Sequence, residues 1–233
     1  MENRSYVSEE EFLSEYDGTR FEKPSVAVDL LIFTIEDNKL KVLMVKRNNY
    51  PFRGCLSLPG VFVNINETLD EAAKRALRQK AGIENIYLEQ LYTWGDIDRD
   101  PRMRIISVSY LALVPKIKIQ SHEQTADSAG LISLDEISDE KNQIAFDHRK
   151  IISYARERIK NKVEYTNIAF EFLPQEFTLP ELQIVYEILL GKKLYKANFR
   201  KKAASLIMPT DRMTTGDAHR PSRYYTLRKN GDE

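Results

Sequence analysis

The chain has 233 residues, enough for one large domain or two modest ones, and its 42% hydrophobic and 10% aromatic content suits a packed core. Its 35 basic and 35 acidic residues cancel, and the single cysteine, Cys55, excludes an internal disulfide and a cysteine-rich zinc site. One cysteine fits a reducing cytosol, and we expect a cytoplasmic protein. The polar N-terminus and short apolar runs predict no signal peptide and no membrane partner.

The charges are unevenly distributed along the chain. Residues 1–20 hold six acidic and two basic residues, whereas residues 192–229 hold eleven basic residues and two aspartates. We interpret residues 1–24 as an acidic arm with one short helix capped by Ser8. The basic segment, with a local charge of +9, predicts contact with a polyanion.

Residues 25–161 predict a mixed sheet with helices. Apolar, β-rich runs predict strands at Val26–Ile35, Leu40–Lys46, Glu84–Trp94 and Ile105–Val114, the last extending towards Gln120. Apolar side chains at helical spacing predict helices at Thr68–Lys80, Ser133–Ser138 and Asp147–Asn161, with Asp147 as an N-cap. Gly60 is expected to turn the chain, and Gly82 to end the first of these helices.

Asp29 interrupts an otherwise apolar strand. A carboxylate there is costly to bury unless it is paired or faces a cleft. A structural hydrogen-bonding role and a ligand-facing role both stay open.

The chain beyond residue 161 changes character. Residues 162–174 are aromatic and extended, and we interpret them as a connector. Thr178 and Glu181 then form a capping box for a helix that ends at Gly191. A basic helix at Lys196–Ile207, a loop to Ser222 and a strand at Arg223–Arg228 follow. This order is typical of a winged helix-turn-helix over residues 175–233.

The stretch Gly60–Ile83 resembles the Nudix box. The match consists of Gly60, Glu67, Arg75, Leu77, Gly82 and Ile83 at the box spacing. Val61 replaces the first glycine of the box. Three glutamates that, by this resemblance, hold magnesium in active members are replaced by Ala76, Gln79 and Lys80. Magnesium requires hard oxygen ligands. We therefore predict a Nudix fold with no catalytic residues, no metal and no required cofactor.

A wider resemblance runs from about Lys23 to Leu227. It is to the Nudix-related transcriptional regulators, and it is carried by YLEQLYTWGDIDRDPR, ISVSYLALVP, AFDHRKII, YTNIAFEFLP, FTLPELQIVYE and NFRKK. The family joins a Nudix-like sensor to a winged helix and acts as dimers on DNA. One branch senses ADP-ribose or its relatives, and another senses L-arabinose. The resemblance implies an α+β chain: a Nudix-like mixed-sheet α/β/α sandwich followed by a C-terminal winged helix-turn-helix domain.

The candidate DNA-binding residues lie in the basic helix and at the wing. Asn and Arg can contact base edges, while Lys more often meets phosphate. The candidates are Asn198, Arg200, Lys201, Lys202, Arg220 and Arg223.

The candidate effector-binding residues gather around Asp29 and the charged loop after Trp94. A sugar site needs an aromatic face with convergent polar groups. The candidates are Asp29, Arg47, Glu67, Trp94, Asp98 and Arg99. His148 and His219 have no evident partners, so a helix-cap role and a wing role are expected for them.

These observations predict a homodimeric, ligand-responsive regulator, a repressor that binds double-stranded operator DNA. The effector is expected to be a pentose such as L-arabinose rather than ADP-ribose, because the metal ligands are lost. The alternative is a magnesium-dependent Nudix hydrolase of nucleoside diphosphate derivatives.

Overall fold

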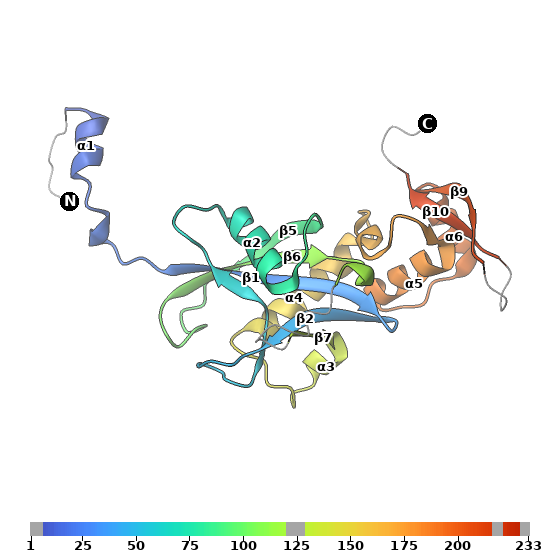
Figure 1. The fold of residues 1–233 in the computed structure, drawn as a ribbon, viewed down its shortest axis with the longest axis horizontal. Coiled ribbons are helices and arrows are strands. Elements are labelled where there is room, and N and C mark those ends of the chain that lie inside the picture. The colour runs from blue at the N-terminus through green and yellow to red at the C-terminus, as the bar shows by residue number, and fades with distance from the viewer. Residues whose placement is uncertain (1–6, 120–128, 216–220, 229–233) are drawn as a thin grey trace.

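The structure is a computed structural model, and it describes residues 7–119, 129–215 and 221–228. Figure 1 shows an N-terminal arm, a body built on a sheet and a smaller C-terminal unit, arranged along the long axis. The sheet of the body has the order β3-β2-β1-β6-β5, with β4 paired to β1 and β7 paired to β2. Its strands are β1 (Ser25–Glu36), β2 (Lys39–Lys46), β3 (Leu56–Ser57), β4 (Gly60–Phe62), β5 (Tyr87–Trp94), β6 (Ile105–Leu113) and β7 (Ala129–Ser133).

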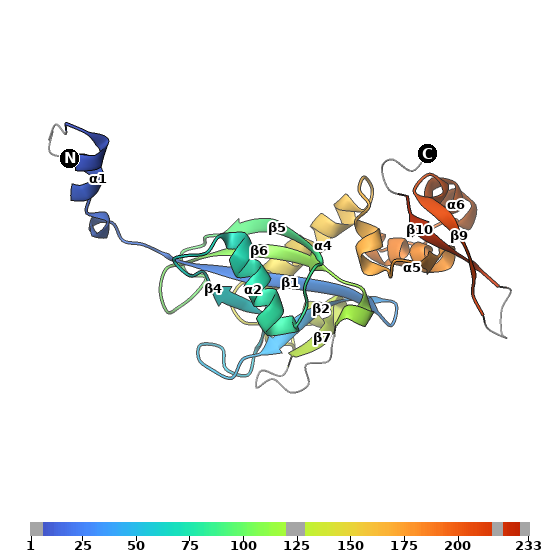
Figure 2. The same ribbon diagram turned by 45° about the horizontal axis from the view of Figure 1, so that its top comes forward.

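Helices cover both faces of this sheet because β1 is apolar on both sides. Side chains alternate along a strand. Leu30 and Ile32 therefore join one core with α2 (Leu69–Ala81), while Leu31 and Phe33 join a second core with α4 (His148–Lys162). In Figure 2, α2 lies in front of the sheet and α4 behind it. The predicted α/β/α sandwich is confirmed.

The helix of the Nudix-like box begins and ends as its sequence predicts. Thr68 and Glu71 form a capping box, and Gly82 adopts a left-handed conformation at the C-cap. In the arm, α1 (Glu9–Glu15) is capped by the Ser8 hydroxyl, which accepts from the Glu11 N–H. The 3₁₀ helix η1 (Gly18–Arg20) follows it.

Residues 162–174 are not an extended connector, contrary to expectation, because much of the segment is helical and about half of it is buried. They contain the 3₁₀ helix η3 (Ile168–Phe172), whose Ile168, Ala169 and Phe170 are buried. These side chains belong to the same core as the α4 face of the sheet. The reason is the amount of apolar surface in this segment, which is more stable against neighbouring helices than in water.

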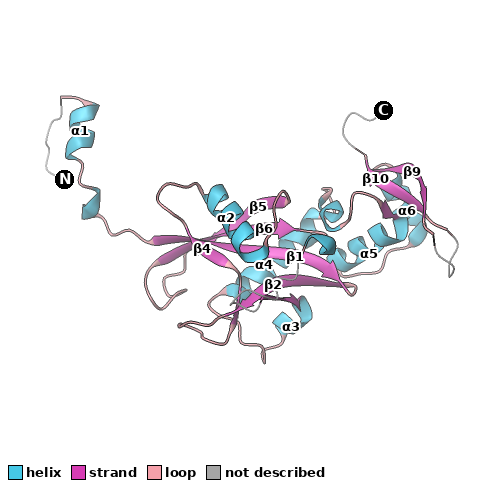
Figure 3. Ribbon diagram, viewed as in Figure 1, coloured by secondary structure: helices cyan, strands magenta, loops and turns pink. Residues whose placement is uncertain are grey.

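The C-terminal unit packs helices against a small sheet, as Figure 3 shows by colour. Its elements are β8 (Phe177–Thr178), α5 (Leu179–Leu190), α6 (Lys196–Ala204), β9 (Ile207–Met213) and β10 (Arg223–Leu227), with strand order β8-β10-β9. The expected capping box at Thr178 and the left-handed Gly191 are present. The predicted loop from Thr210 instead begins within a strand, and α6 ends earlier than Ile207.

Three further elements differ from expectation. The strand β7 was not predicted, although the short helix after it, α3 (Leu134–Ser138), was. The 3₁₀ helix η2 (Lys116–Lys118) stands where a strand extension was expected. Within the described ranges, no helix is both long and apolar enough to cross a bilayer.

Gly60 lies in β4 rather than in a turn, and its importance is close packing. It pairs with Asp29 of β1. A Cβ atom at position 60 would lie 2.5 Å from Asp29 Oδ1 and 2.8 Å from the Val28 carbonyl oxygen. Because Gly60 has no side chain, the carboxylate of Asp29 can occupy the space beside β4.

We predict that Gly60→Ala destabilises the protein by about 1–3 kcal/mol, the usual cost of overpacking. The matched control is Gly130→Ala in β7, where the nearest atom to an added Cβ is 3.9 Å away. Urea unfolding followed by circular dichroism measures both. Equal midpoints for the two variants would contradict the close-packing argument.

Candidate functional site

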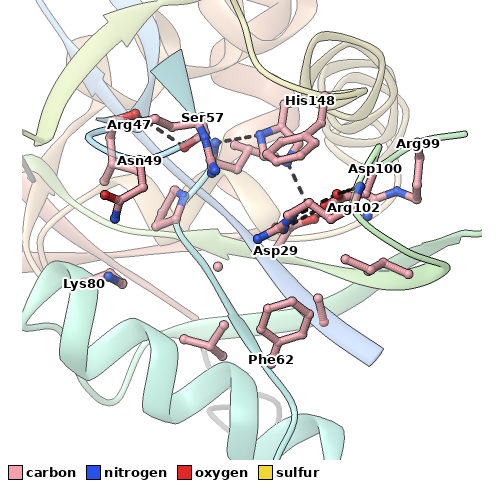
Figure 4. A pocket seen from close by; sticks show the side chains of 18 of the residues that line it. Asp29, Arg47, Asn49, Ser57, Phe62, Lys80, Arg99, Asp100, Arg102 and His148 are labelled. Carbon is pink, nitrogen blue, oxygen red and sulfur yellow. Dashed lines mark hydrogen bonds and ion pairs between the residues drawn. The ribbon is translucent and has the colours of Figure 1, made fainter. Parts of the chain in front are cut away.

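A cleft of about 260 Å³ opens on the body where β1, β4 and the start of α4 meet two loops. Figure 4 shows its polar side chains converging from these elements. Residues that bear on its chemistry are Asp29, Lys46, Arg47, Asn49, Ser57, Phe62, Lys80, Arg99, Asp100, Arg102, Phe146 and His148. The cleft is thus assembled from segments far apart in the sequence.

Arg99 forms a buried fork between two carboxylates. Its Nε and Nη2 donate to Asp147 at 3.0 and 2.8 Å, and Nη2 also lies 3.5 Å from Asp29 Oδ2. Asp147 stands at the N-cap position of α4, as predicted, but its side chain makes no capping bond. A bidentate guanidinium is the stronger partner for a carboxylate, so Asp147 binds Arg99 instead.

Asp29 is held from several sides. The Ser107 hydroxyl on the parallel neighbour β6 donates to its Oδ2, the atom that Arg99 also approaches. Gly60 on β4 leaves the space that the carboxylate occupies. Asp29 therefore combines the two roles that its sequence position left open: it is hydrogen-bonded within the fold and it lines the cleft.

His148 is buried at the back of the cleft and is not a helix cap. Its Nδ1 accepts the Leu58 N–H at 2.9 Å, and its Nε2 lies 3.8 Å from Asp29 Oδ2. An imidazole whose Nδ1 accepts a hydrogen bond carries its proton on Nε2 when neutral. Burial lowers the pKa of His148, against the opposing effect of Asp29 and Asp147. No local motif marks this contact, because Leu58 lies 90 residues away in the chain.

The cleft carries an excess of positive charge. Its described lining contains five basic side chains, Lys46, Arg47, Lys80, Arg99 and Arg102, against the two carboxylates Asp29 and Asp100. Asp147, which binds Arg99 from outside this lining, lowers the excess to two positive charges. Both lining carboxylates are engaged, because Arg99 lies against Asp29 and Arg102 binds Asp100 at 2.8 Å. The cleft is therefore suited to an anion.

Arg47 and Phe146 form a packed pair at the cleft. The guanidinium of Arg47 lies 4.7 Å from the centre of the Phe146 ring, and its Nε donates to the Pro51 carbonyl at 2.8 Å. Phe52 meets the Phe146 ring edge-on. Sequence reasoning missed Phe146, which lies just before the predicted helix.

Three of the six predicted effector residues line the cleft, namely Asp29, Arg47 and Arg99. Glu67 instead pairs with Arg75, whose hydrogen bonds lower the pKa of Glu67 to about 2. Trp94 is buried, donates to Ser109 Oγ at 2.9 Å and packs against Tyr154. Asp98 is exposed on the loop. Glu67 and Trp94 therefore have other partners, Asp98 lies outside the described lining, and a role in effector binding stays a prediction for all three.

The box positions do not suit magnesium. Ala76 is buried in the core, Gln79 is exposed, and Lys80 brings an ammonium group to the cleft. In the described part of the chain, no cluster of three or more His, Cys, Asp or Glu side chains could hold a metal ion. Magnesium takes oxygen ligands, and one or two carboxylates usually anchor it.

A second charged surface lies on the C-terminal unit. Asn198, Arg200, Lys201 and Lys202 are exposed on α6, and the Lys202 ammonium sits 5.2 Å from the centre of the Tyr186 ring. Arg200 and Arg223 line one groove together with Arg228, which sequence reasoning missed. Arg220, also predicted here, lies outside the described residues, as does His219.

The comparisons agree with this two-part architecture. The NUDIX domain family matches residues 23–155, and the NrtR DNA-binding winged helix domain matches residues 169–227. The chain is 34% identical to the ADPR responsive transcriptional repressor NtrR of Acinetobacter baylyi, over 95% of this chain and 89% of that protein.

This chain belongs to the Nudix-related transcriptional regulators. Within the family, it is similar to the crystal structure of Shewanella oneidensis NrtR complexed with a 27mer DNA (TM-score 0.78, 36% identity, 87% of this chain and 93% of that one). The NUDIX domain of that NrtR complexed with ADP ribose matches at TM-score 0.58 and 35% identity, over 65% of this chain and 99% of that one.

One relative of this chain is an enzyme. The ADP-ribose pyrophosphatase of Methanocaldococcus jannaschii is 36% identical over 129 residues, which is 55% of this chain and 71% of that protein. The match is shorter than that to the repressor and is too short to span both domains.

We predict that His148 makes stability depend on pH. The unfolded side chain has a pKa of about 6.5, whereas burial lowers the folded value. Its contribution is therefore complete above about pH 6.5 and is lost as pH falls through the folded pKa. His148→Gln should reduce the slope of unfolding free energy against pH below 6.5 by at most one proton, about 1.4 kcal/mol per pH unit.

Urea titrations of both proteins across this range measure the slope. An unchanged slope in His148→Gln would mean that His148 titrates alike in the folded and unfolded chains.

Proposed function

We propose that this protein is a transcriptional repressor whose Nudix domain binds ADP-ribose and thereby weakens its hold on operator DNA. The observation that carries the proposal is the cleft with two excess positive charges. ADP-ribose carries a diphosphate with two negative charges, which such a lining attracts. A neutral pentose gains nothing from this excess. Two relatives support ADP-ribose as the effector: one is described as an ADPR responsive repressor, and the other is a NUDIX domain complexed with ADP ribose. Neither supports the pentose that the sequence analysis favours.

The binding of DNA is assigned to α6 and the arginine-lined groove beside it. Arg200 and Arg223 face this groove from α6 and from β10. Winged helices place a helix in the major groove, and arginine can contact guanine edges or phosphates. A homodimer would present two such surfaces to one operator, as the family resemblance implies.

Helix α4 joins the two sites. At its start, Asp147 holds Arg99 and His148 lines the cleft. At its end, Lys162 pairs with Glu89 and hydrogen-bonds the Tyr87 hydroxyl at 2.9 Å. Val163, directly after it, shares a core with η3 and α5. An anion that binds near Arg99 therefore competes for contacts that fix one end of a helix whose other end packs towards the DNA-binding unit.

Coupling between the effector site and the DNA-binding surface acts equally in both directions. If ADP-ribose lowers DNA affinity, the DNA complex must bind ADP-ribose more weakly by the same factor, typically about 5- to 150-fold. Fluorescence anisotropy with a labelled operator, selected from random duplexes by the protein itself, measures this factor. We predict that ADP-ribose raises the operator Kd within that range and that L-arabinose leaves it unchanged. Release by L-arabinose, with none by ADP-ribose, would refute the assignment.

In the same assay, we predict that Arg200→Ala and Arg223→Ala each weaken operator binding by about 1–3 kcal/mol, roughly 5- to 150-fold. The matched control is Arg78→Ala, which removes an exposed arginine from α2 in the sensor domain. Intact operator binding by both groove variants would remove α6 and β10 from the DNA interface.

A metal-dependent hydrolase is the second candidate, favoured by the likeness to the pyrophosphatase. The replacements Ala76, Gln79 and Lys80 argue against it. Incubation with ADP-ribose and magnesium, with AMP release as the readout, separates the two. Turnover on the order of 1 s⁻¹ or faster would lie in the enzyme range and would favour the hydrolase.

A further inference from the structure

Lys80 is the residue through which the box helix takes part in the cleft. It lies in the last turn of α2 and is the one α2 side chain among the described residues that line the cleft. Figure 4 shows it across the cleft from Asp29 and Arg102, on the same side as Asn49. A cation in the last turn of a helix is favoured by the helix dipole, because the C-terminal carbonyls carry partial negative charge.

The described carboxylates of α2 and of the turn before it have partners within the fold. Glu67 binds Arg75 through both of its oxygens. Asp70 accepts from the Tyr110 hydroxyl at 2.6 Å, and Glu71 completes the capping box with Thr68. Among the described residues, α2 therefore presents an ammonium group and no carboxylate to the cleft. This wall does not fit magnesium, which takes oxygen ligands.

We propose that the ammonium of Lys80 stands in for a divalent cation, so that the diphosphate of the effector is held directly by lysine and arginine side chains without metal. This inference rests on the proposed function and deepens it. Lys80 carries a single compact charge with three donors. Together with the guanidinium of Arg47 it can match the two charges of a diphosphate. No metal is then present to polarise the phosphoryl groups, and the effector is bound without being cut.

Isothermal titration of the full-length protein with ADP-ribose tests this, once in excess EDTA and once in millimolar magnesium chloride. We expect the same Kd in both buffers for the wild-type protein. Lys80→Met should weaken binding roughly 10- to 100-fold, the loss expected when a charged hydrogen-bond donor is removed. Lys80→Arg should restore binding to within a few-fold of wild type, because it keeps the charge.

The matched control is Lys74→Met, which makes the same change on the same helix at an exposed position outside the cleft lining. It should bind as wild type does. Wild-type binding that requires magnesium, or unimpaired binding by Lys80→Met, would overturn the inference while leaving the proposed function standing. No binding of ADP-ribose by the wild-type protein in either buffer would overturn the proposed function and this inference with it.

Discussion

The buried fork of Arg99 between Asp147 and Asp29 joins three segments that the chain brings together from distant positions. Arg99 belongs to the loop after β5, Asp29 to the central strand β1, and Asp147 to the start of α4. Burying such charges costs desolvation energy that their attraction offsets only with good geometry. The arrangement serves instead to position these segments. It fixes the loop after β5 and helix α4 against the sheet, and the cleft lies among them.

In the box helix, the residues that build the helix and the residues at the metal positions of the box are separate sets. The contacts that build the helix are retained in full: the Thr68 capping box, the Glu67–Arg75 pair and the left-handed Gly82. The positions that the resemblance assigns to magnesium-binding glutamates carry Ala76, Gln79 and Lys80. A residue that packs or caps is constrained by neighbours within the fold, whereas a metal ligand is constrained only by the metal. The residues that build the helix and the residues at metal positions can therefore be replaced independently of each other.

Features that depend on neighbours in the chain could be predicted from the sequence. The capped starts of α2 and α5, their glycine ends and the two-sided apolar pattern of β1 all follow from local chemistry. What could not be predicted depended on partners far away. Asp147 has the sequence of a cap, yet Arg99 binds it from 48 residues earlier. Residues 162–174 look like a linker until the core that covers them is known.

Trp94 illustrates the same limit in the site. An aromatic residue beside a charged loop suggested a ligand platform, but its ring packs into the core and its indole N–H is satisfied by Ser109. Burial is a property of the folded chain, and no window of sequence around Trp94 reports it. The charge of the cleft was equally hidden, since Lys46, Lys80 and Arg102 come together only through the sheet.

The length of α4 has a mechanical consequence. Its 15 residues span about 22 Å at 1.5 Å per residue. It is held at the cleft by Asp147 and His148 and packs at its far end beside η3 and α5. A tilt of about 5° at one end would move the other by roughly 2 Å, well beyond the range of about 0.5 Å over which hydrogen-bond lengths vary. A movement too small to reshape the cleft would thus be enough to break a hydrogen bond at the far end of α4.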